Sequence, residues 1–259
     1  MEMEITLPDE VPVMTLPNVA FFPQALMPLH IFEPRYRQML RDVLASNRLF
    51  AVAGLDPNRL GEPGRSEPPH RIAAVGIIRA CQKSDDGTSN LLLQGICRVE
   101  ITHIVADEPY RRIRVRALAS QPGASAHDNE LLRTELARLL ALKFRLAATG
   151  AGEMAVFLKT VEDPETFVDI AAFSLCENAR LKQKLLETLN VHRRLVIFRE
   201  QVRNEITTLK LRRKLQGRPA FSDSVRAFEE VGMKQKAGLP SRQRGLQQPS
   251  EKGFGIVVA

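Results

Sequence analysis

The sequence predicts an α+β fold in which strands come first and helices follow. Up to about residue 120, short runs of Val, Ile and Leu alternate with Pro and Gly, as is typical of strands and turns. From about residue 127 the apolar residues recur instead at the helical period of 3.6. The length of 259 residues allows one large domain or two modest ones. We expect a strand-rich unit at 1–122, a helical unit at 123–217 and a disordered basic tail at 218–259.

The strand-rich part is predicted to hold six strands and one inserted helix. The strands are expected at residues 11–16, 49–55, 73–81, 90–94, 96–105 and 111–119. A turn at Ser84-Asp85-Asp86-Gly87 indicates a hairpin between the third and fourth of them. The helix is expected to follow Glu33, because Pro34 suits the first position of a helix and the apolar residues up to position 46 have helical spacing.

Five helices are predicted in the second part, at residues 129–148, 155–161, 163–175, 181–189 and 190–216. Asp163 followed by Pro164 is a helix start in which the acid caps the first turn. Asn190 is expected to cap the last and longest helix, which ends at Gly217. The apolar stripe of that helix comprises Leu195, Phe198, Val202, Ile206 and Leu209.

Several classes of protein are excluded by composition. There is no run of about 18 apolar residues, so we expect no membrane span, and the acidic start MEMEITLPDE is not a signal peptide. Cys81, Cys97 and Cys176 are odd in number and far apart, which fits reduced thiols in a cytoplasmic protein. The scattered histidines form no metal-binding pattern. We therefore expect neither a metal nor another cofactor.

Catalytic motifs are also missing from the sequence. It contains no GxxxxGK[ST] loop for ATP, no GxSxG elbow and no SxxK pair. Cys97 and His103 would share one strand face, but six residues of strand separate them by roughly 20 Å. We therefore expect this chain not to be an enzyme.

The segment from Leu16 to Leu40, LPNVAFFPQALMPLHIFEPRYRQML, carries the most specific pattern. Pro17, Pro23 and Pro28 rule out a continuous helix or a central strand, so the segment should wind over a core. It resembles the start of the N-terminal, substrate-binding domain of Lon proteases. The blocks VGIIRACQKSDDGTSNLLLQGICRVE and Asp163 to Leu195 resemble later parts of that domain. The resemblance covers residues 7–212.

The resemblance implies a small PUA-like open β-barrel with one inserted helix, followed by a helical subdomain that ends in a long helix. It implies a non-catalytic module that recognises unfolded or tagged polypeptides, as an adaptor or holdase in protein quality control. A protease or chaperone is the further partner expected. The ATPase and the Ser–Lys peptidase of full-length Lon proteases have no counterpart in this sequence.

Two groups of site residues follow from the resemblance and the segment's composition. Phe21, Phe22, Met27 and Phe32 are the candidates for an apolar polypeptide-binding surface, and the alternative is that they belong to the barrel core. A second group is assigned a structural role, in which the acid caps the helix and the arginine bridges to a distant carboxylate. It comprises His30, Glu33, Pro34, Arg35 and Tyr36.

An RNA-binding alternative rests on basic residues. Arg112, Arg114 and Arg116 would share one face of a strand, and the helix at 192–218 is rich in Arg and Lys. Few aromatic residues lie nearby to stack on bases. The alternative to RNA binding is that these arginines form a solvated strand face and pair with nearby acidic residues. The formal charge of +7 comes from that helix and the tail. The apolar stripe of the helix also allows a homodimer.

Overall fold

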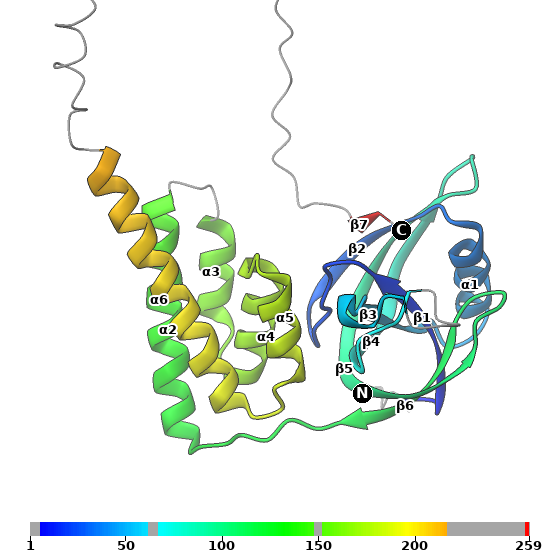
Figure 1. Ribbon diagram of the computed structural model, residues 1–259, viewed down its shortest axis with the longest axis horizontal. Coiled ribbons are helices and arrows are strands. Elements are labelled where there is room, and N and C mark those ends of the chain that lie inside the picture. Colours follow the sequence, from blue (N-terminus) through cyan, green and yellow to red (C-terminus); the bar gives the residue numbers. More distant parts are fainter. Residues whose placement is uncertain (1–5, 62–66, 148–151, 217–256, 259) are drawn as a thin grey trace, which may run out of the picture.

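The computed structural model describes residues 6–61, 67–147, 152–216 and 257–258, and it contains a sheet and a separate group of helices (Figure 1). The seven strands pair in the order β4-β3-β1-β6-β5-β2-β7. They are β1 (Glu10–Leu16), β2 (Leu26–Ile31), β3 (Leu49–Gly54), β4 (Ile72–Lys83), β5 (Ser89–Ala106), β6 (Arg112–Leu118) and β7 (Val257–Val258). The predicted tail lies outside the described residues apart from β7.

The sheet closes on itself, because β4 pairs with both β3 and β5. Only β1 and β3 run parallel in this five-stranded ring; the other pairs are antiparallel. The resemblance implies an open barrel, and the sequence pattern predicts two strands at 90–94 and 96–105. In the structure those two are one long strand, β5, whose pairings with β4 and β6 complete the ring. Register shifts in both pairings allow so long a strand to bend.

Strand β2 is an element that sequence reasoning missed. It contains Pro28 and pairs antiparallel with the first part of β5, from Leu26 opposite Gln94 to Ile31 opposite Ser89. A proline argues against a central strand because it lacks an N–H donor. β2 tolerates it because the strand lies outside the closed ring, on the edge that the ring leaves free.

Helix α1 (Pro34–Leu44) is the predicted inserted helix. It begins with Pro34 as expected, and it buries Tyr36, Met39, Leu40 and Val43. Glu33 occupies the N-cap position, but its side chain makes no capping hydrogen bond. The predicted capping role of Glu33 is therefore wrong, because its carboxylate is bound to Arg35 instead.

The helical part contains α2 (Ala126–Ala147), α3 (Gly152–Thr160), α4 (Pro164–Leu175), α5 (Ala179–Glu187) and α6 (Val191–Gln216). The predicted caps are confirmed: Asp163 accepts from the N–H of Thr166 at 2.7 Å, and Asn190 from that of Arg193 at 2.8 Å. Contacts at both ends of α2 and α6 show that these helices lie side by side in the same direction.

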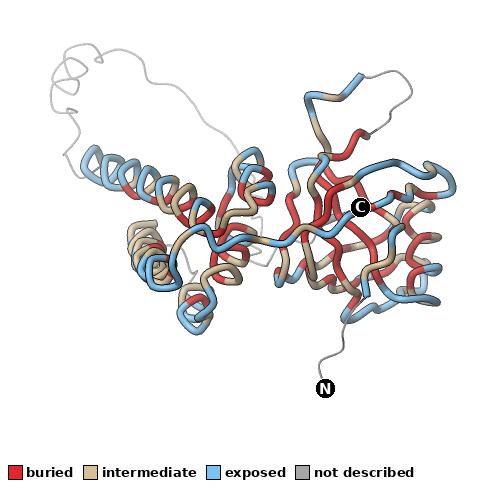
Figure 2. Tube along the Cα trace, turned by 90° about the horizontal axis from the view of Figure 1, so that it is seen from below, coloured by how far each residue is buried: buried red, intermediate tan, exposed pale blue. Residues whose placement is uncertain are grey.

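The apolar stripe of α6 is used within the chain. Leu195, Phe198, Val202 and Ile206 are buried, and so are Leu136 and Leu140 of α2. One cluster of buried side chains includes these residues together with residues of β1, β2 and α1. The core therefore runs from the sheet into the helices, and Figure 2 shows buried segments in both parts. The stripe predicted for a homodimer is already covered as far as Ile206.

Candidate functional site

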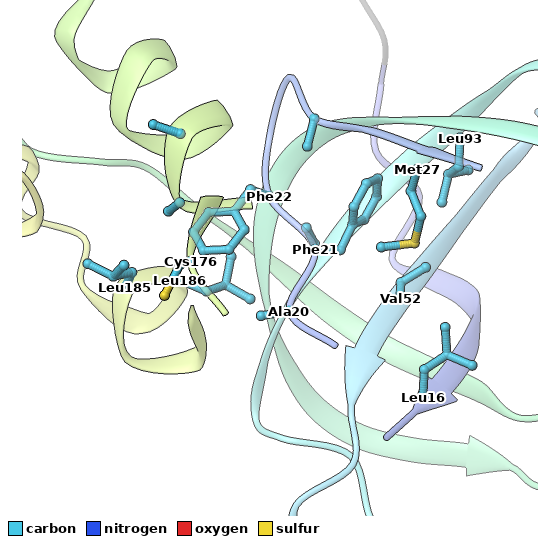
Figure 3. Close-up of a cluster of buried hydrophobic side chains, with 14 of the residues drawn as sticks. Leu16, Ala20, Phe21, Phe22, Met27, Val52, Leu93, Cys176, Leu185 and Leu186 are labelled. Atoms are coloured by element: carbon cyan, nitrogen blue, oxygen red, sulfur yellow. The ribbon is translucent and has the colours of Figure 1, made fainter. Parts of the chain in front are cut away.

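Phe21 and Phe22 hold the sheet and the helices together. The ring of Phe21 lies edge-on to that of Phe173 in α4, with 6.2 Å between centroids. The ring of Phe22 lies beside Cys176 and Leu186, while Phe21 lies on the side of the sheet (Figure 3). Both phenylalanines belong to the common core. This junction is thus a packed apolar contact between the two parts of the molecule.

Two glycines make room for this junction. A Cβ atom at Gly95 of β5 would lie 2.0 Å from the carbonyl oxygen of Phe22. A Cβ atom at Gly76 of β4 would lie 2.8 Å from Cε1 of Phe21. Real atoms do not approach so closely, so the phenylalanine segment reaches the sheet only because both positions lack a side chain.

The structure corrects most of the predicted binding surface. Phe21 and Phe22 are 0% exposed and Met27 is 1% exposed. No ligand reaches these side chains in the folded protein, so for these three the core alternative is the right one. The physical reason is that Phe21 and Phe22 lie where the segment passes between the sheet and the helices, whereas Met27 is an inward-facing residue of β2. Phe32 differs, with 43% of its surface exposed.

Phe32 belongs to an exposed apolar stripe along β2. The inward side chains Met27, Leu29 and Ile31 are buried. The alternate residues face outward, as period-2 geometry requires. We call them the β2 stripe: Leu26, Pro28, His30 and Phe32. Leu26 is 51% exposed. The alternation in LMPLHIF was the sequence signal for this stripe.

His30 orders the exposed end of the β2 stripe. Its ring stacks on that of Phe32 with 6.2 Å between centroids. Its Nδ1 is 2.8 Å from Oδ1 of Asn90, on the neighbouring strand β5. The imidazole ring of His30 therefore lies roughly parallel to the exposed Phe32 ring and adds to its apolar surface. The Nδ1 atom of His30 is meanwhile satisfied by its hydrogen bond with Asn90.

The residues that follow the stripe form a structural network. Arg35 donates to both carboxylate oxygens of Glu67, at 2.8 and 2.9 Å, and to Glu33 at 2.8 Å. Glu67 is the distant carboxylate that the sequence predicts for Arg35. The guanidinium lies 4.6 Å from the centroid of the Tyr36 ring. Burial raises the pKa of Tyr36, so that its phenol stays protonated. The arrangement anchors the start of α1 and offers no proton relay.

A buried ionic cluster fixes the helices against the barrel. Arg98 of β5 donates to both carboxylate oxygens of Asp169 in α4, each at 2.7 Å. Arg194 of α6 bonds to the same carboxylate. Burial lowers the pKa of Arg194, although the charge of Asp169 opposes that effect. Sequence reasoning missed this cluster, whose members are far apart in the chain and carry no local pattern.

The predicted basic strand face is present but largely neutralised. Arg112, Arg114 and Arg116 point outward along β6. Arg114 forms an ion pair with Glu10 at 2.9 Å, and Arg116 pairs with Glu100. The hydrogen bond from Arg116 lowers the pKa of Glu100. The nucleic-acid alternative gains no support from this face and stays a prediction.

Three basic residues in the first half of helix α6 are also paired with acids within the chain. Arg194 belongs to the buried cluster, and Arg199 and Arg203 both pair with Glu135 of α2 and Glu200. These cations hold α6 against its neighbour. Their charge is therefore committed within the chain.

A cleft with a volume of ≈ 840 Å³ lies beside Arg71, Glu100, His103 and Arg116. Its ionic groups bind one another, since Glu100 pairs with both arginines. Within the described ranges, no three His, Cys, Asp or Glu side chains meet in a way that holds a metal ion. None of the described helices has the length and apolar character needed to cross a bilayer.

The known proteins that this chain resembles in sequence include several Lon proteases. A family model described as the ATP-dependent protease La (LON) substrate-binding domain matches residues 10–203. The Lon protease of Desulfosudis oleivorans is 26% identical over 213 residues, which are 81% of this chain and 26% of that protein. The Lon protease of Heliobacterium modesticaldum is 28% identical over 210 residues, with 81% and 26% covered. The chain thus spans about a quarter of the length of these relatives.

Solved structures with the same arrangement confirm the predicted α+β class. The N-terminal domain of a Mycobacterium avium complex Lon protease superimposes with a TM-score of 0.57 at 17% identity, covering 76% of this chain and 98% of that one. A Lon N-terminal domain protein from Xanthomonas campestris gives 0.51 at 19% identity, with 72% and 94% covered. At such identities the likeness concerns the fold alone.

Proposed function

The chain belongs to the family of Lon substrate-binding domains, and we propose that it recognises exposed apolar segments of polypeptides without cleaving them. The observation that carries this proposal is the β2 stripe, whose Leu26 and Phe32 are about half exposed. Large apolar side chains in such a position lose contact with water when a partner covers them, which favours association.

The β2 stripe combines apolar surface with a polar border. Leu26 and Phe32 flank Pro28 and His30, and Asn90 and Gln94 of β5 lie opposite His30 and Leu26. Fully burying a Leu or Phe side chain contributes about 1.5–3 kcal/mol. Because the two residues start half exposed, about half of that is available from each. Such a surface suits weak, reversible binding of many sequences rather than tight binding of one.

The finer proposal is that the protein serves as an adaptor or holdase in protein quality control in the cytoplasm. Its clients would be unfolded or tagged polypeptides, and a protease or chaperone would receive them. The match to one domain within much longer Lon proteases supports a recognition role, because the matched region is the substrate-binding part. The free thiols of Cys81, Cys97 and Cys176 fit a reducing compartment.

Fluorescence anisotropy with a labelled, permanently unfolded client protein tests this function. The double variant Leu26→Ser/Phe32→Ser is expected to bind the client at least about tenfold more weakly, since about 1.5–3 kcal/mol of apolar contact is lost from the two residues together. The matched control is Leu60→Ser/Val156→Ser, which removes apolar side chains that are also exposed but lie elsewhere. Absence of client binding by the unaltered protein, or an equal loss in both variants, would refute the proposal.

A further inference from the structure

One edge of β2 faces away from the barrel. The N–H of Gly95 donates to the carbonyl of Ala25 at 2.9 Å, so the carbonyl group of residue 25 points towards β5. Backbone groups alternate in direction along a strand. Those of Met27 and Leu29 therefore also point towards β5, and those of Pro28 and His30 point outward.

The last described residues of the chain lie on this outward edge. Val257 and Val258 form β7, which pairs parallel with β2 (Figure 1). Leu29 is opposite Val257 and His30 is opposite Val258. The register places β7 against the outward backbone groups of β2. This edge of the sheet therefore accepts an added strand, and the chain supplies one itself.

Pro28 defines which groups of the edge are available. It has no N–H, and because it points outward, no hydrogen bond to β5 is lost. The outward edge keeps the carbonyl groups of Pro28 and His30 as acceptors and the N–H of His30 as a donor. A short extended segment is enough to use these groups.

The edge also adjoins the β2 stripe. In strand addition, main-chain hydrogen bonds hold the peptide, and its alternate side chains contact the surface beside the edge. Leu26 and Phe32 supply exposed apolar surface at the two ends of the edge. The C-terminal sequence Gly255-Ile-Val-Val-Ala259 has the β-branched, apolar composition of an extended strand.

We propose that the outward edge of β2, from Leu26 to His30, is a strand-addition site for an extended apolar polypeptide segment, and that Val257–Val258 occupies it as an intramolecular competitor. The inference rests on the proposed function, because the segment it admits is the client. A competitor on the same chain acts at a high effective concentration, so a client must displace it. Because β7 has two residues, the competition is weak enough to be overcome.

A full-length variant with Val257→Pro and Val258→Pro tests the competition, since proline removes the backbone N–H groups with which β7 could donate to the carbonyls of β2. Val257→Ile/Val258→Ile is the matched control, which keeps the strand-forming character. Two labelled probes are used: a peptide of residues 253–259 and the unfolded client. The proline variant is expected to bind both at least about threefold more tightly than the unaltered protein, the value of one backbone hydrogen bond. The isoleucine variant should bind like the unaltered protein.

Amide hydrogen exchange of His30, followed by NMR, gives a readout that needs no client. Its N–H should exchange faster in the proline variant than in the isoleucine variant. Equal exchange, together with equal binding of both probes, would overturn the competition by β7. If that occurs while Leu26→Ser/Phe32→Ser still weakens client binding, the proposed function stands and this inference falls. If the client binds none of the proteins, both fall.

Discussion

Arg98 of β5 and Asp169 of α4 are joined by two hydrogen bonds of 2.7 Å across 71 residues of sequence, with both side chains almost completely buried. Arg98 also donates to the carbonyl of Leu186 at 3.0 Å, and Arg194 shares the carboxylate. One carboxylate therefore fixes a strand and two helices. A buried group of this kind specifies one geometry of the junction.

Asp169→Asn should destabilise the protein strongly, because it leaves two buried guanidinium groups without their main counter-charge. We expect a loss of about 3–5 kcal/mol in the free energy of unfolding, measured by urea denaturation. Glu165→Gln is the control, since Glu165 is 37% exposed and 3.4 Å from both arginines; its loss should be about 1 kcal/mol or less. Equal losses would contradict a central role for Asp169.

Truncating Phe22 and truncating Phe32 should have very different effects on the free energy of unfolding. Phe22→Ala creates a cavity between the sheet and the helices and is expected to cost about 3–5 kcal/mol. Phe32→Ala removes an exposed ring and should change stability by at most about 0.5 kcal/mol. Thermal and urea unfolding of both variants measures the difference. A large destabilisation by Phe32→Ala would show that its ring is part of the core.

Stability should fall in acid partly through Glu100. The hydrogen bond from Arg116 lowers its pKa below the ordinary value of 4.5, and the charge of Arg71 adds to this effect. A group whose pKa is lower in the folded state stabilises fully above its unfolded pKa and loses that contribution as the pH falls through the folded value. Glu100→Gln should therefore lower the urea midpoint near neutral pH, and its difference from the unaltered protein should shrink below pH 4.5.

Urea midpoints of both proteins near neutral pH and in the acid range provide this measurement. Asp107→Asn is a suitable control, because Asp107 pairs with Arg111 at 2.6 Å, whereas Arg116 pairs with Glu100. A Glu100→Gln difference that stays constant across the whole range would show that the pairing with Arg116 does not contribute to stability.

The stripe of α6 should serve folding rather than association. Val202→Asp places a carboxylate among buried apolar side chains and is expected to unfold the helical part or to destabilise it by several kcal/mol. Leu211→Asp, at a position that is 57% exposed, should leave stability unchanged. Circular dichroism and light scattering separate the outcomes. A folded Val202→Asp variant that only dissociates from a dimer would refute the intrachain role.

Local patterns explain which parts of this fold could be predicted from the sequence. The helix starts at Pro34, Asp163 and Asn190 were predictable because capping depends on neighbouring residues. The pairing of Arg98 with Asp169 was not, because two charges far apart in sequence leave no periodic signal. The burial of Phe22 could not be predicted either. An apolar run bent by prolines has no regular period, so the sequence does not indicate which of its side chains face water.

The candidate site was partly predictable for the same reason. The apolar composition of the segment predicts Phe32 as a surface residue, and Phe32 is exposed. Pro28 argues against a strand, so the outward position of Leu26 is not predicted. The alternation of inward and outward side chains around Pro28 is visible in the sequence. It was outweighed by the general rule that proline breaks strands, which does not apply at an outward-facing edge position.

Pro28 has a further consequence for the behaviour of the protein at high concentration. Unpaired strand edges are templates on which identical chains stack into fibres, and proline on an edge is one of the features that prevent such growth. A missing donor in the middle of β2 interrupts any continuous ladder that a second copy would form there. The edge thus admits a short strand but is a poor nucleus for aggregation.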